Sequence, residues 1–420
     1  MPWTLVPKSS PVPLALDRQI VGSANNIVES QGGSSAESEP DQEADSVSMK
    51  AFEGTKSGRT PVPDWGGNPM TNARMRNHLA SCLGAASIAA MLGFAATDAA
   101  AQDVTLRVHH FLPPPSVAHA QFIEPWANQV MEESDGRIAV EIYPSMQLGG
   151  APPSLHDQVR DGVVDVVWTL PGYTPGRFPL TEVFELPFMA GSAEATSQAA
   201  QAFYEENLAD EYGDVHVLML HTHAPGTFHM RDDAFDSLDD LADQSIRAPT
   251  RVINDALAAL GAVPVGMPVP QVPEALSRGV VDGTVIPWEV ARPLRVQELV
   301  CCHTEIDADR GFYTSVFLFA MNKDVYEGLP DDLRAVIDNN SGMALAQQIG
   351  QVWDEAEAPG RQAAVDAGND FVVLSDEVVA EMADLTQGVI DTWVAQTTDA
   401  GHDGDALLAR ARELVDQYSQ

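Results

Sequence analysis

The stretch Gly162-Val163-Val164-Asp165 recurs in the second half of the chain as Gly279-Val280-Val281-Asp282. Glycine ends a helix because it accepts the left-handed backbone conformation, and the two valines are typical of the start of a buried strand. Each copy therefore predicts a step from helix to strand, and the repeat predicts two similar α/β lobes, each with its own sheet. A strand pattern and a short helical pattern precede each copy: 138–143 and 155–160 in the first half, and 263–265 and 272–278 in the second.

Strand and helix patterns alternate along the chain from residue 103. This order predicts parallel sheets with helices on both faces. Two helical patterns late in the chain fit helices that brace both lobes. Further strand patterns lie at 104–110 and 163–168, and further helical patterns at 121–133, at 331–353 with an interruption at 339–342, and at 377–395.

The composition is strongly acidic. The 420 residues include 23 Lys and Arg against 61 Asp and Glu, which gives a formal net charge of -38. A chain of this length allows two domains. Its charge repels nucleic acid and anionic lipid, so we expect no nucleic-acid partner. Because the acids run along the whole chain, adaptation to high salt is a better interpretation than an acidic recognition surface.

The N-terminal region has the pattern of a targeting segment. Residues 1–74 are rich in Ser, Gly, Pro and Glu and predict a disordered or mis-started extension. Residues 75–101 predict a signal peptide, with an apolar run at 79–96 and alanines before the expected cleavage site. We therefore expect a periplasmic protein. A lipoprotein anchored at Cys82 is disfavoured, because the apolar run follows that cysteine.

The sequence leaves open whether Cys301 and Cys302 form a vicinal disulfide. Cys301 and Cys302 are adjacent, and a bond between them would close a small, strained ring. No disulfide framework is implied, and the preferred interpretation is two small apolar residues in a strand.

Arg247 is the strongest candidate for a ligand-binding residue. It ends the strand pattern at 244–247, and a helical pattern at 251–260 follows, with Thr250 as its expected N-cap. In open α/β sheets, ligands bind at the carboxyl ends of strands and beside helix N-termini. Arginine offers a rigid pair of N–H donors that matches a carboxylate. A surface salt bridge is the alternative interpretation in so acidic a chain.

Two tryptophans follow the copies of the repeated motif. Trp168 ends the strand after the first copy, and Trp288 and Glu289 follow the strand after the second. At equivalent strand ends the two indoles would face each other across a cleft and stack on a ligand. Core packing is at least as good an interpretation for Trp168. Glu289 would bind a hydroxyl, an amine or a positioning arginine.

The histidines form two groups, His109, His110 and His119 in one and His221, His223 and His229 in the other. His-x-His on a strand is a spacing of metal ligands, but no Asp or Cys partner stands at a diagnostic spacing. We therefore expect no metal or other cofactor, and His110 at the end of a strand is instead a candidate hydrogen-bond partner of a ligand. The sequence also has no phosphate-binding loop, Gly-x-Ser-x-Gly elbow or dinucleotide fingerprint, so nothing in it requires an enzyme.

Several further motifs occur in order and at characteristic spacing: Gly136-Arg137-Ile138, Tyr143-Pro144, Gln147-Leu148-Gly149, Phe184-Glu185-Leu186-Pro187-Phe188, Asp240-Leu241, Ile246-Arg247-Ala248-Pro249, Ala259-Leu260-Gly261-Ala262, Pro264-Val265-Gly266-Met267-Pro268 and Glu274-Ala275-Leu276. With the two Gly-Val-Val-Asp copies, they make the chain from about 103 to 400 resemble the DctP-like periplasmic solute-binding subunits of TRAP (tripartite ATP-independent) transporters.

The resemblance implies a periplasmic-binding-protein-like α/β fold of two lobes, each with a central mixed or parallel sheet, joined by hinge strands and braced by a long helix. We expect lobe I at 102–224 plus 313–352 and lobe II at 225–312 plus 353–420. The lobes would close on a small organic acid whose carboxylate Arg247 clamps, and the closed form would dock on the TRAP membrane permease. A monomer and a dimer both fit.

A second arginine often lies upstream in this family, and Arg231 is the nearest candidate. Many members carry Asn-Pro after the second Val-Asp-Gly strand, where this chain has Pro287-Trp288-Glu289. The departure puts the usual ligand classes in doubt, and a tryptophan there fits a more apolar or ring-bearing acid. We expect specificity from Trp288, Glu289, Trp168 and the loop around Tyr173.

Two alternative functions remain open at this stage. A metal-dependent periplasmic enzyme would use His221, His223 and His229, and metal analysis of the purified protein would reveal it. A sensory receptor would bind the same carboxylate but report to a kinase or a chemoreceptor. Neighbouring permease genes would distinguish a transporter subunit from such a receptor.

Overall fold

The computed structural model describes residues 103–420. The extension predicted at 1–74, the signal peptide predicted at 75–101 and Cys82 lie outside the described residues. Within residues 103–420, no helix is long and apolar enough to cross a membrane.

The first sheet has five strands in the order β2-β1-β3-β10-β4. Strands β1, β2 and β3 run parallel, whereas β10 is antiparallel to both β3 and β4. Its strands are β1 (Val104–His110), β2 (Ile138–Tyr143), β3 (Val166–Thr169), β4 (His216–Thr222) and β10 (Val316–Met321).

The second sheet has six strands in the order β11-β9-β5-β8-β6-β7. Strand β6 runs parallel to β7 and β8, whereas β5 is antiparallel to β8 and β9. Its strands are β5 (Thr227–Met230), β6 (Ser245–Ala248), β7 (Val263–Gly266), β8 (Gly283–Ile286), β9 (Cys302–Glu305) and β11 (Asp370–Val373).

The two sheets repeat one local pattern around the aspartates of the Gly-Val-Val-Asp motif. The N–H of Asp165 donates to the carbonyl of Arg107 at 3.1 Å, and its carboxylate accepts from the N–H of Arg107 at 2.8 Å. Asp282 makes the same two bonds with Ser245, at 2.7 Å and 2.8 Å. The order β2-β1-β3 thus corresponds to β7-β6-β8, as the repeat in the sequence predicts.

The strands begin later than the motif suggests. Val163 and Val280 are 53% and 56% exposed, whereas Val164 and Val281 are fully buried. Both strands start at the residue after the aspartate. Since the chain turns from a helix into a strand across the motif, the first valine of each copy faces solvent, and only the second enters the core.

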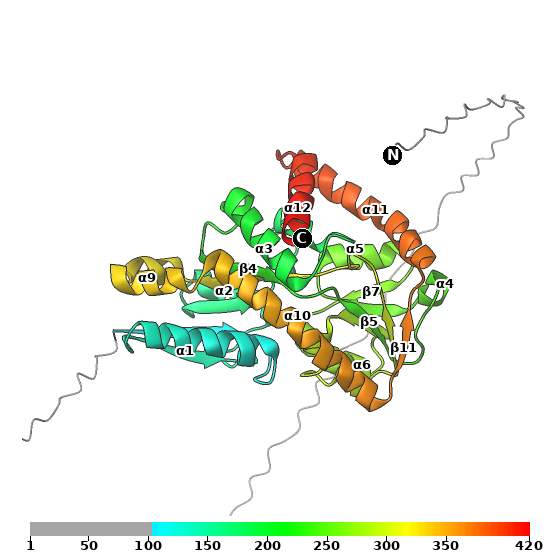
Figure 1. The fold of residues 1–420 in the computed structure, drawn as a ribbon, viewed down its shortest axis with the longest axis horizontal. Coiled ribbons are helices and arrows are strands. Elements are labelled where there is room, and N and C mark those ends of the chain that lie inside the picture. The colour runs from blue at the N-terminus through cyan, green and yellow to red at the C-terminus, as the bar shows by residue number, and fades with distance from the viewer. Residues whose placement is uncertain (1–102) are drawn as a thin grey trace, which may run out of the picture. The chain divides into compact units, whose positions relative to one another are not determined.

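Helices surround both sheets (Figure 1). The observed ends agree with the sequence patterns to within a few residues, except that the helix expected to end at Trp353 continues to Ala367. The helices are α1 (Glu124–Glu133), α2 (Leu155–Arg160), α3 (Ala193–Phe203), α4 (Leu238–Leu241), α5 (Arg251–Ala259), α6 (Val272–Ser277), α7 (Trp288–Ala291), α8 (Lys323–Gly328), α9 (Asp331–Asn339), α10 (Gly342–Ala367), α11 (Asp376–Asp399) and α12 (Gly404–Tyr418).

Helix α10 connects the elements of the two sheets. It packs against α3 and β4 beside the first sheet (Figure 1), and against α7 beside the second. Two of its glycines allow close backbone approach, because a Cβ at Gly350 would lie 2.5 Å from the Cα of Glu194, and one at Gly360 would lie 2.1 Å from the carbonyl oxygen of Trp288. The long bracing helix expected from the sequence is therefore present.

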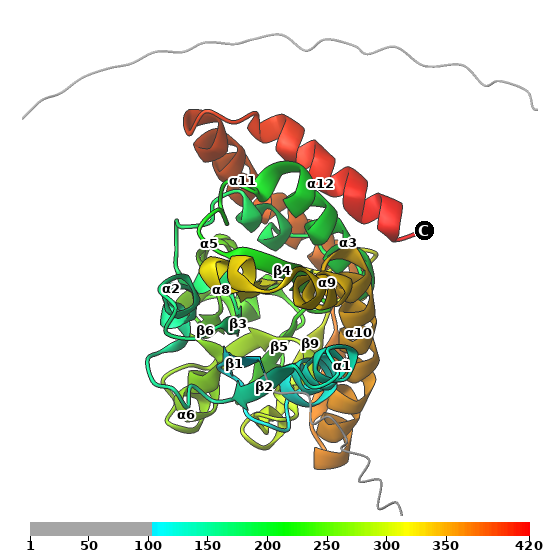
Figure 2. The same ribbon diagram turned by 90° about the vertical axis from the view of Figure 1, so that its left-hand side faces the viewer.

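The C-terminal helix α12 packs against α3 (Figure 2). Its buried side chains include Ala411, Leu414 and Val415, and Arg410 forms an ion pair with Glu206. The expected bounds place residues 353–420 in the lobe of the second sheet, and the contact of α12 with α3 also connects this segment to the first sheet.

Cys301 and Cys302 are joined by a disulfide. The interpretation as two small apolar residues in a strand is therefore wrong for this pair. Strand β9 begins at Cys302, so Cys301 lies outside the regular strand, in which neighbouring side chains point to opposite faces.

We predict that Gly350→Ala destabilises the protein. The added methyl would press on the backbone of Glu194, and such overpacking typically costs about 1–3 kcal/mol. Gly388→Ala is the matched control, because a Cβ there meets nothing within 4 Å; its helix propensity should add up to about 1 kcal/mol. Urea unfolding of both variants measures the effect. Equal stabilisation by the two substitutions would contradict the close approach of α10 and α3.

Candidate ligand-binding site

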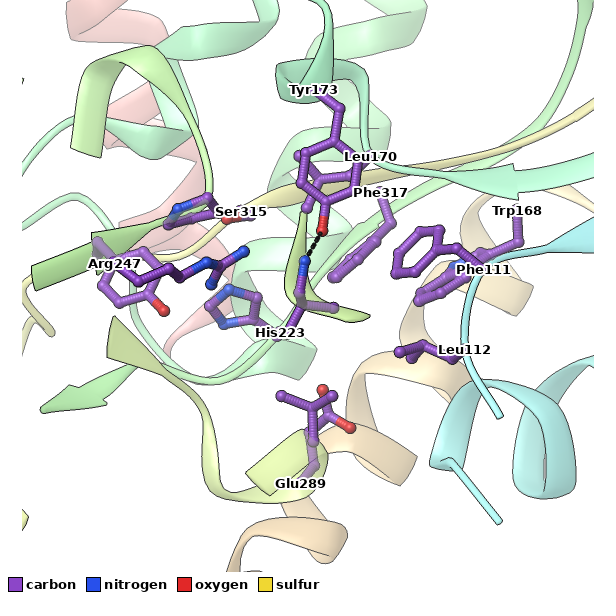
Figure 3. A pocket seen from close by; sticks show the side chains of 14 residues that line it. Phe111, Leu112, Trp168, Leu170, Tyr173, His223, Arg247, Glu289, Ser315 and Phe317 are labelled. Atoms are coloured by element: carbon purple, nitrogen blue, oxygen red, sulfur yellow. Dashed lines mark hydrogen bonds between the residues drawn. The ribbon is translucent and has the colours of Figure 1, made fainter. Parts of the chain in front are cut away.

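A cavity with about 360 Å³ of atom-free space is lined by residues from both sheets. Most of the lining is apolar or aromatic, with a few polar groups (Figure 3). The lining residues are Phe111, Leu112, Trp168, Leu170, Tyr173, His223, Arg247, Pro249, Val269, Glu289, Val290, Tyr313, Ser315 and Phe317.

The guanidinium of Arg247 is buried in this cavity, with 1% of the residue exposed. Its Nε and Nη2 donate to the carbonyl of Met267 at 2.9 Å and 2.7 Å, and its Nη1 donates to the carbonyl of Val285 at 3.3 Å. These bonds use three of the five N–H donors, and the hydroxyl of Tyr173 also interacts with the guanidinium. Within residues 103–420 no carboxylate forms an ion pair with Arg247.

Polar groups of two other elements lie on the same side of the cavity as Arg247 (Figure 3). The hydroxyl of Tyr173 accepts a hydrogen bond from the N–H of Val269 at 3.0 Å. The hydroxyl of Ser315 is buried and has no partner among the described residues. Burial, with a smaller contribution from the charge of Arg247, lowers the pKa of His223 to about 4. His223 is therefore neutral at pH 7, and Arg247 supplies the positive charge of this wall.

Three aromatic rings form the opposite wall (Figure 3). The indole of Trp168 stacks on Phe317 with ring centroids 4.6 Å apart, and on Phe111 with centroids 4.9 Å apart. Its Nε1–H donates to Nε2 of His221 at 2.8 Å, which satisfies the indole and fixes the ring. This stack presents apolar ring surface to the cavity and suits a flat apolar group.

Glu289 reaches the cavity from α7. It is 4% exposed, and its Oε2 has no hydrogen-bond partner among residues 103–420. Burial and the nearby Glu357 raise the pKa of Glu289 well above its usual value. This raised pKa favours the protonated carboxylic acid, which can both donate and accept a hydrogen bond.

Four of the seven residues predicted to bind a ligand line this cavity: Arg247, Tyr173, Trp168 and Glu289. The other three, Trp288, His110 and Arg231, lie outside its lining. Thr250 occupies the N-cap position of α5 as expected, but its hydroxyl makes no capping bond.

Trp288 does not face Trp168 across the cavity, as the sequence had suggested. Asp165 and Asp282 are equivalent in the two sheets, and Trp168 lies three residues after Asp165. The equivalent residue in the second sheet is therefore Val285. Trp288 comes later, in α7, where its ring packs edge-on against His229 and His303.

His110 and Arg231 are held away from the cavity for separate reasons. His110 packs edge-on against Trp168 with ring centroids 6.4 Å apart, and its Nε2 lies 3.0 Å from Nδ1 of His119. The backbone N–H of Arg231 donates to the carbonyl of Asp282, which precedes β8. Arg231 therefore lies beside the start of β8, whereas α7 follows the other end of that strand.

The sequence analysis missed several lining residues. Phe111 follows the end of β1, so the same rule that selected Arg247 could have selected it. Ser315 and Phe317 come from the start of β10, an antiparallel strand far along the chain from β1 and β3. No local motif marks them, because only the pairing of β10 with β3 brings them to the cavity.

The histidines proposed for a metal enzyme do not converge. His221 lies on β4 of the first sheet, whereas His229 lies on β5 of the second and faces His303 with their Nδ1 atoms 2.8 Å apart. In the described part of the chain, no group of three or more His, Cys, Asp or Glu side chains is arranged to hold a metal ion.

Residues 108–397 match the DctP family, bacterial extracellular solute-binding protein family 7. The chain belongs to this family. Both the resemblance to TRAP solute-binding proteins and the expected two-sheet α/β fold are thereby confirmed. This DctP-family chain is also 28% identical over 312 residues to the outer membrane transporter protein TsaT of Comamonas testosteroni, and the match covers 73% of this chain and 90% of TsaT.

Solved structures of the family include two of high similarity. A marine metagenome TRAP solute-binding protein described as specific for aromatic acid ligands, in complex with 3-hydroxybenzoate, is 50% identical, with a TM-score of 0.75 and coverage of 76% of this chain and 100% of that one. A TRAP solute-binding protein from Rhodoferax ferrireducens, with copurified benzoate, is 45% identical, with a TM-score of 0.74 and coverage of 75% and 98%.

A buried acid supports the wall of the cavity from behind. Glu185 is 2% exposed; one of its oxygens accepts from the N–H of Val316 at 3.4 Å, and the other has no partner among the described residues. Val316 lies between the lining residues Ser315 and Phe317. Burial raises the pKa of Glu185 to about 8.

We predict that Glu185→Gln makes the protein less sensitive to rising pH. Between its unfolded-state pKa of about 4.3 and its folded-state pKa, Glu185 holds a proton in the folded state that the unfolded state has lost. Stability that is present at low pH is therefore lost as pH rises through this window, by up to about 1.4 kcal/mol per pH unit. The free energy of unfolding should thus rise in the variant relative to wild type between pH 5 and pH 8. Urea unfolding at several pH values tests this, with exposed Glu381→Gln as control; parallel curves for wild type and Glu185→Gln would refute it.

Proposed function

We propose that this protein binds a one-ring aromatic carboxylate in the periplasm and delivers it to a TRAP permease. The observation that carries the proposal is the buried guanidinium of Arg247, which has no carboxylate partner within residues 103–420 and faces a cavity with an aromatic wall. A buried cation is costly to leave unpaired, so an anionic ligand would stabilise it.

The two walls of the cavity suit the two ends of such a ligand. The N–H groups of Arg247 that the two carbonyls do not use would take the carboxylate, and the hydroxyl of Ser315 offers another donor nearby. The ring would extend toward Trp168, Phe111 and Phe317. Closure of two lobes, 102–224 plus 313–352 and 225–312 plus 353–420, would exclude water and strengthen the ion pair.

The ligands of the relatives support an aromatic acid over an aliphatic one. Two solved relatives at 45% and 50% identity hold benzoate and 3-hydroxybenzoate. A C4-dicarboxylate-binding periplasmic protein of the same family, from Rhodobacter capsulatus, is only 25% identical. The aromatic stack opposite Arg247 offers no partner for a second carboxylate.

The cellular role follows from the family and the N-terminal sequence pattern. The signal peptide pattern at 75–101 supports export, and TRAP solute-binding proteins serve membrane permeases. Binding and release would involve no bond-making, so we propose no catalytic residue. Because the net charge is -38, binding assays should be run in high salt, which screens the repulsion between the negative charges of the protein.

We predict that Arg247→Met weakens the binding of benzoate by at least about 30-fold. Loss of one partner of a buried, hydrogen-bonded charge pair typically costs 2–5 kcal/mol or more. Arg247→Lys keeps the charge but not the two-pronged donor geometry and should also weaken binding. Isothermal titration calorimetry gives the affinities, with Arg278→Met as control, since the Arg278 side chain is 71% exposed. Unchanged affinity in Arg247→Met would remove the basis of the proposal.

We further predict that benzoate stabilises the protein, whereas malate at the same concentration does not. A ligand at one hundred times its dissociation constant adds about 2.7 kcal/mol to the free energy of unfolding. Malate would place a second carboxylate against the aromatic wall, where nothing offsets its desolvation. Thermal unfolding in high salt with each acid measures the difference. Equal stabilisation by malate would argue against an aromatic ligand.

A further inference from the structure

Arg247 and Glu289 line the same cavity without pairing with each other. No ion pair joins them, and Arg247 is instead held by the carbonyls of Met267 and Val285. In Figure 3, Arg247 lies on one side of the cavity, the Trp168 and Phe111 rings on the other, and Glu289 reaches in from a third side. The two groups are therefore placed to contact different parts of one ligand.

The Glu289 carboxyl is built into the cavity with an unused oxygen. It is 4% exposed, yet its Oε2 has no partner in the described part of the chain. Buried polar atoms are nearly always hydrogen-bonded, so an unpartnered one beside a cavity indicates a partner that the protein itself does not supply.

The surroundings of Glu289 determine its protonation. Glu357 on α10 accepts hydrogen bonds from the backbone N–H groups of Trp288 and Glu289, at 3.2 Å and 2.9 Å. These donors favour the ionised form of Glu357, whereas the Glu289 carboxyl has one side-chain donor nearby, the indole of Trp353. Of this pair of acids, Glu289 is therefore the one whose protonated form is more strongly favoured. An uncharged Glu289 also avoids repelling an anionic ligand.

We propose that Glu289 recognises a hydroxyl group at the 3-position of the ligand's aromatic ring, so that this protein prefers 3-hydroxylated aromatic acids to unsubstituted ones. A carboxylic acid and a hydroxyl each donate and accept, so the two can bond to each other. With its carboxylate at Arg247, a ring points its 4-position at Trp168 and Phe111 and turns its 3-position toward Glu289. The 4-position meets only apolar rings, where a hydroxyl would lose its hydrogen bonds to water.

This inference rests on the proposed function, and the test separates the two. Affinities for benzoate, 3-hydroxybenzoate and 4-hydroxybenzoate are measured by calorimetry on the purified full-length protein after removal of bound ligand. The wild type should bind 3-hydroxybenzoate at least about tenfold more tightly than either other acid, because those leave a buried polar group unpaired.

Two substitutions of Glu289 then locate the source of the preference. Glu289→Leu should reduce the ratio of affinities for 3-hydroxybenzoate and benzoate to about one. Glu289→Gln should keep a preference, since an amide also donates and accepts. Glu274→Leu, whose native side chain is 64% exposed on α6, is the matched control and should keep the wild-type ratio. Unfolding curves of each variant verify folding.

The outcomes are distinct. Equal binding of benzoate and 3-hydroxybenzoate by wild type, a stronger response to 4-hydroxybenzoate, or a preference that survives in Glu289→Leu would each overturn the role of Glu289, while an aromatic acid remained the ligand. If wild type binds none of the three acids, the proposed function fails as well.

Discussion

The guanidinium of Arg247 is held among main-chain carbonyls in a cavity that the protein lines almost entirely with apolar groups. The carbonyls of Met267 and Val285 fix its plane, and no side-chain carboxylate within residues 103–420 balances its charge. The hydrogen bond from Arg247 on β6 to the carbonyl of Val285 on β8 requires these two strands to be neighbours in the sheet. The strand order of the second sheet thus places one buried cation in the lining of the cavity.

Helix α10 ties this site to the rest of the protein. At Gly350 it touches the backbone of α3, and at Gly360 it touches the backbone of α7. Between these points Trp353 is fully buried, and Glu357 caps the start of α7 through the N–H groups of Trp288 and Glu289. Helix α10 therefore packs against elements of both sheets and also holds the segment that carries Glu289. The contacts of this one helix support both the cavity wall and the packing of the two sheets.

Sequence reasoning succeeded where neighbouring residues decide the outcome. The helix and strand patterns, the glycine stops and the Gly-Val-Val-Asp repeat depend on local backbone preference and apolar periodicity, and they predicted most element positions. The position of Arg247 at a strand end before a helix was also a local signal. The same reasoning failed for Trp288. Counted from the equivalent residues Asp165 and Asp282, the residue that corresponds to Trp168 is Val285, and Trp288 lies three residues beyond it.

From the sequence alone, the α/β class, the repeated unit, the long bracing helix and the place of Arg247 at a strand end could be derived, since each depends on a short stretch of chain. The tertiary structure alone decided that Phe111, Trp168 and Phe317 form one wall, that Ser315 and Tyr173 lie on the side of Arg247, and that Glu289 enters from α7 with a raised pKa. These depend on the pairing of β10 with β3 and on burial by α10. Contacts between distant segments, and the loss of water that shifts a pKa, exist only after the chain has folded.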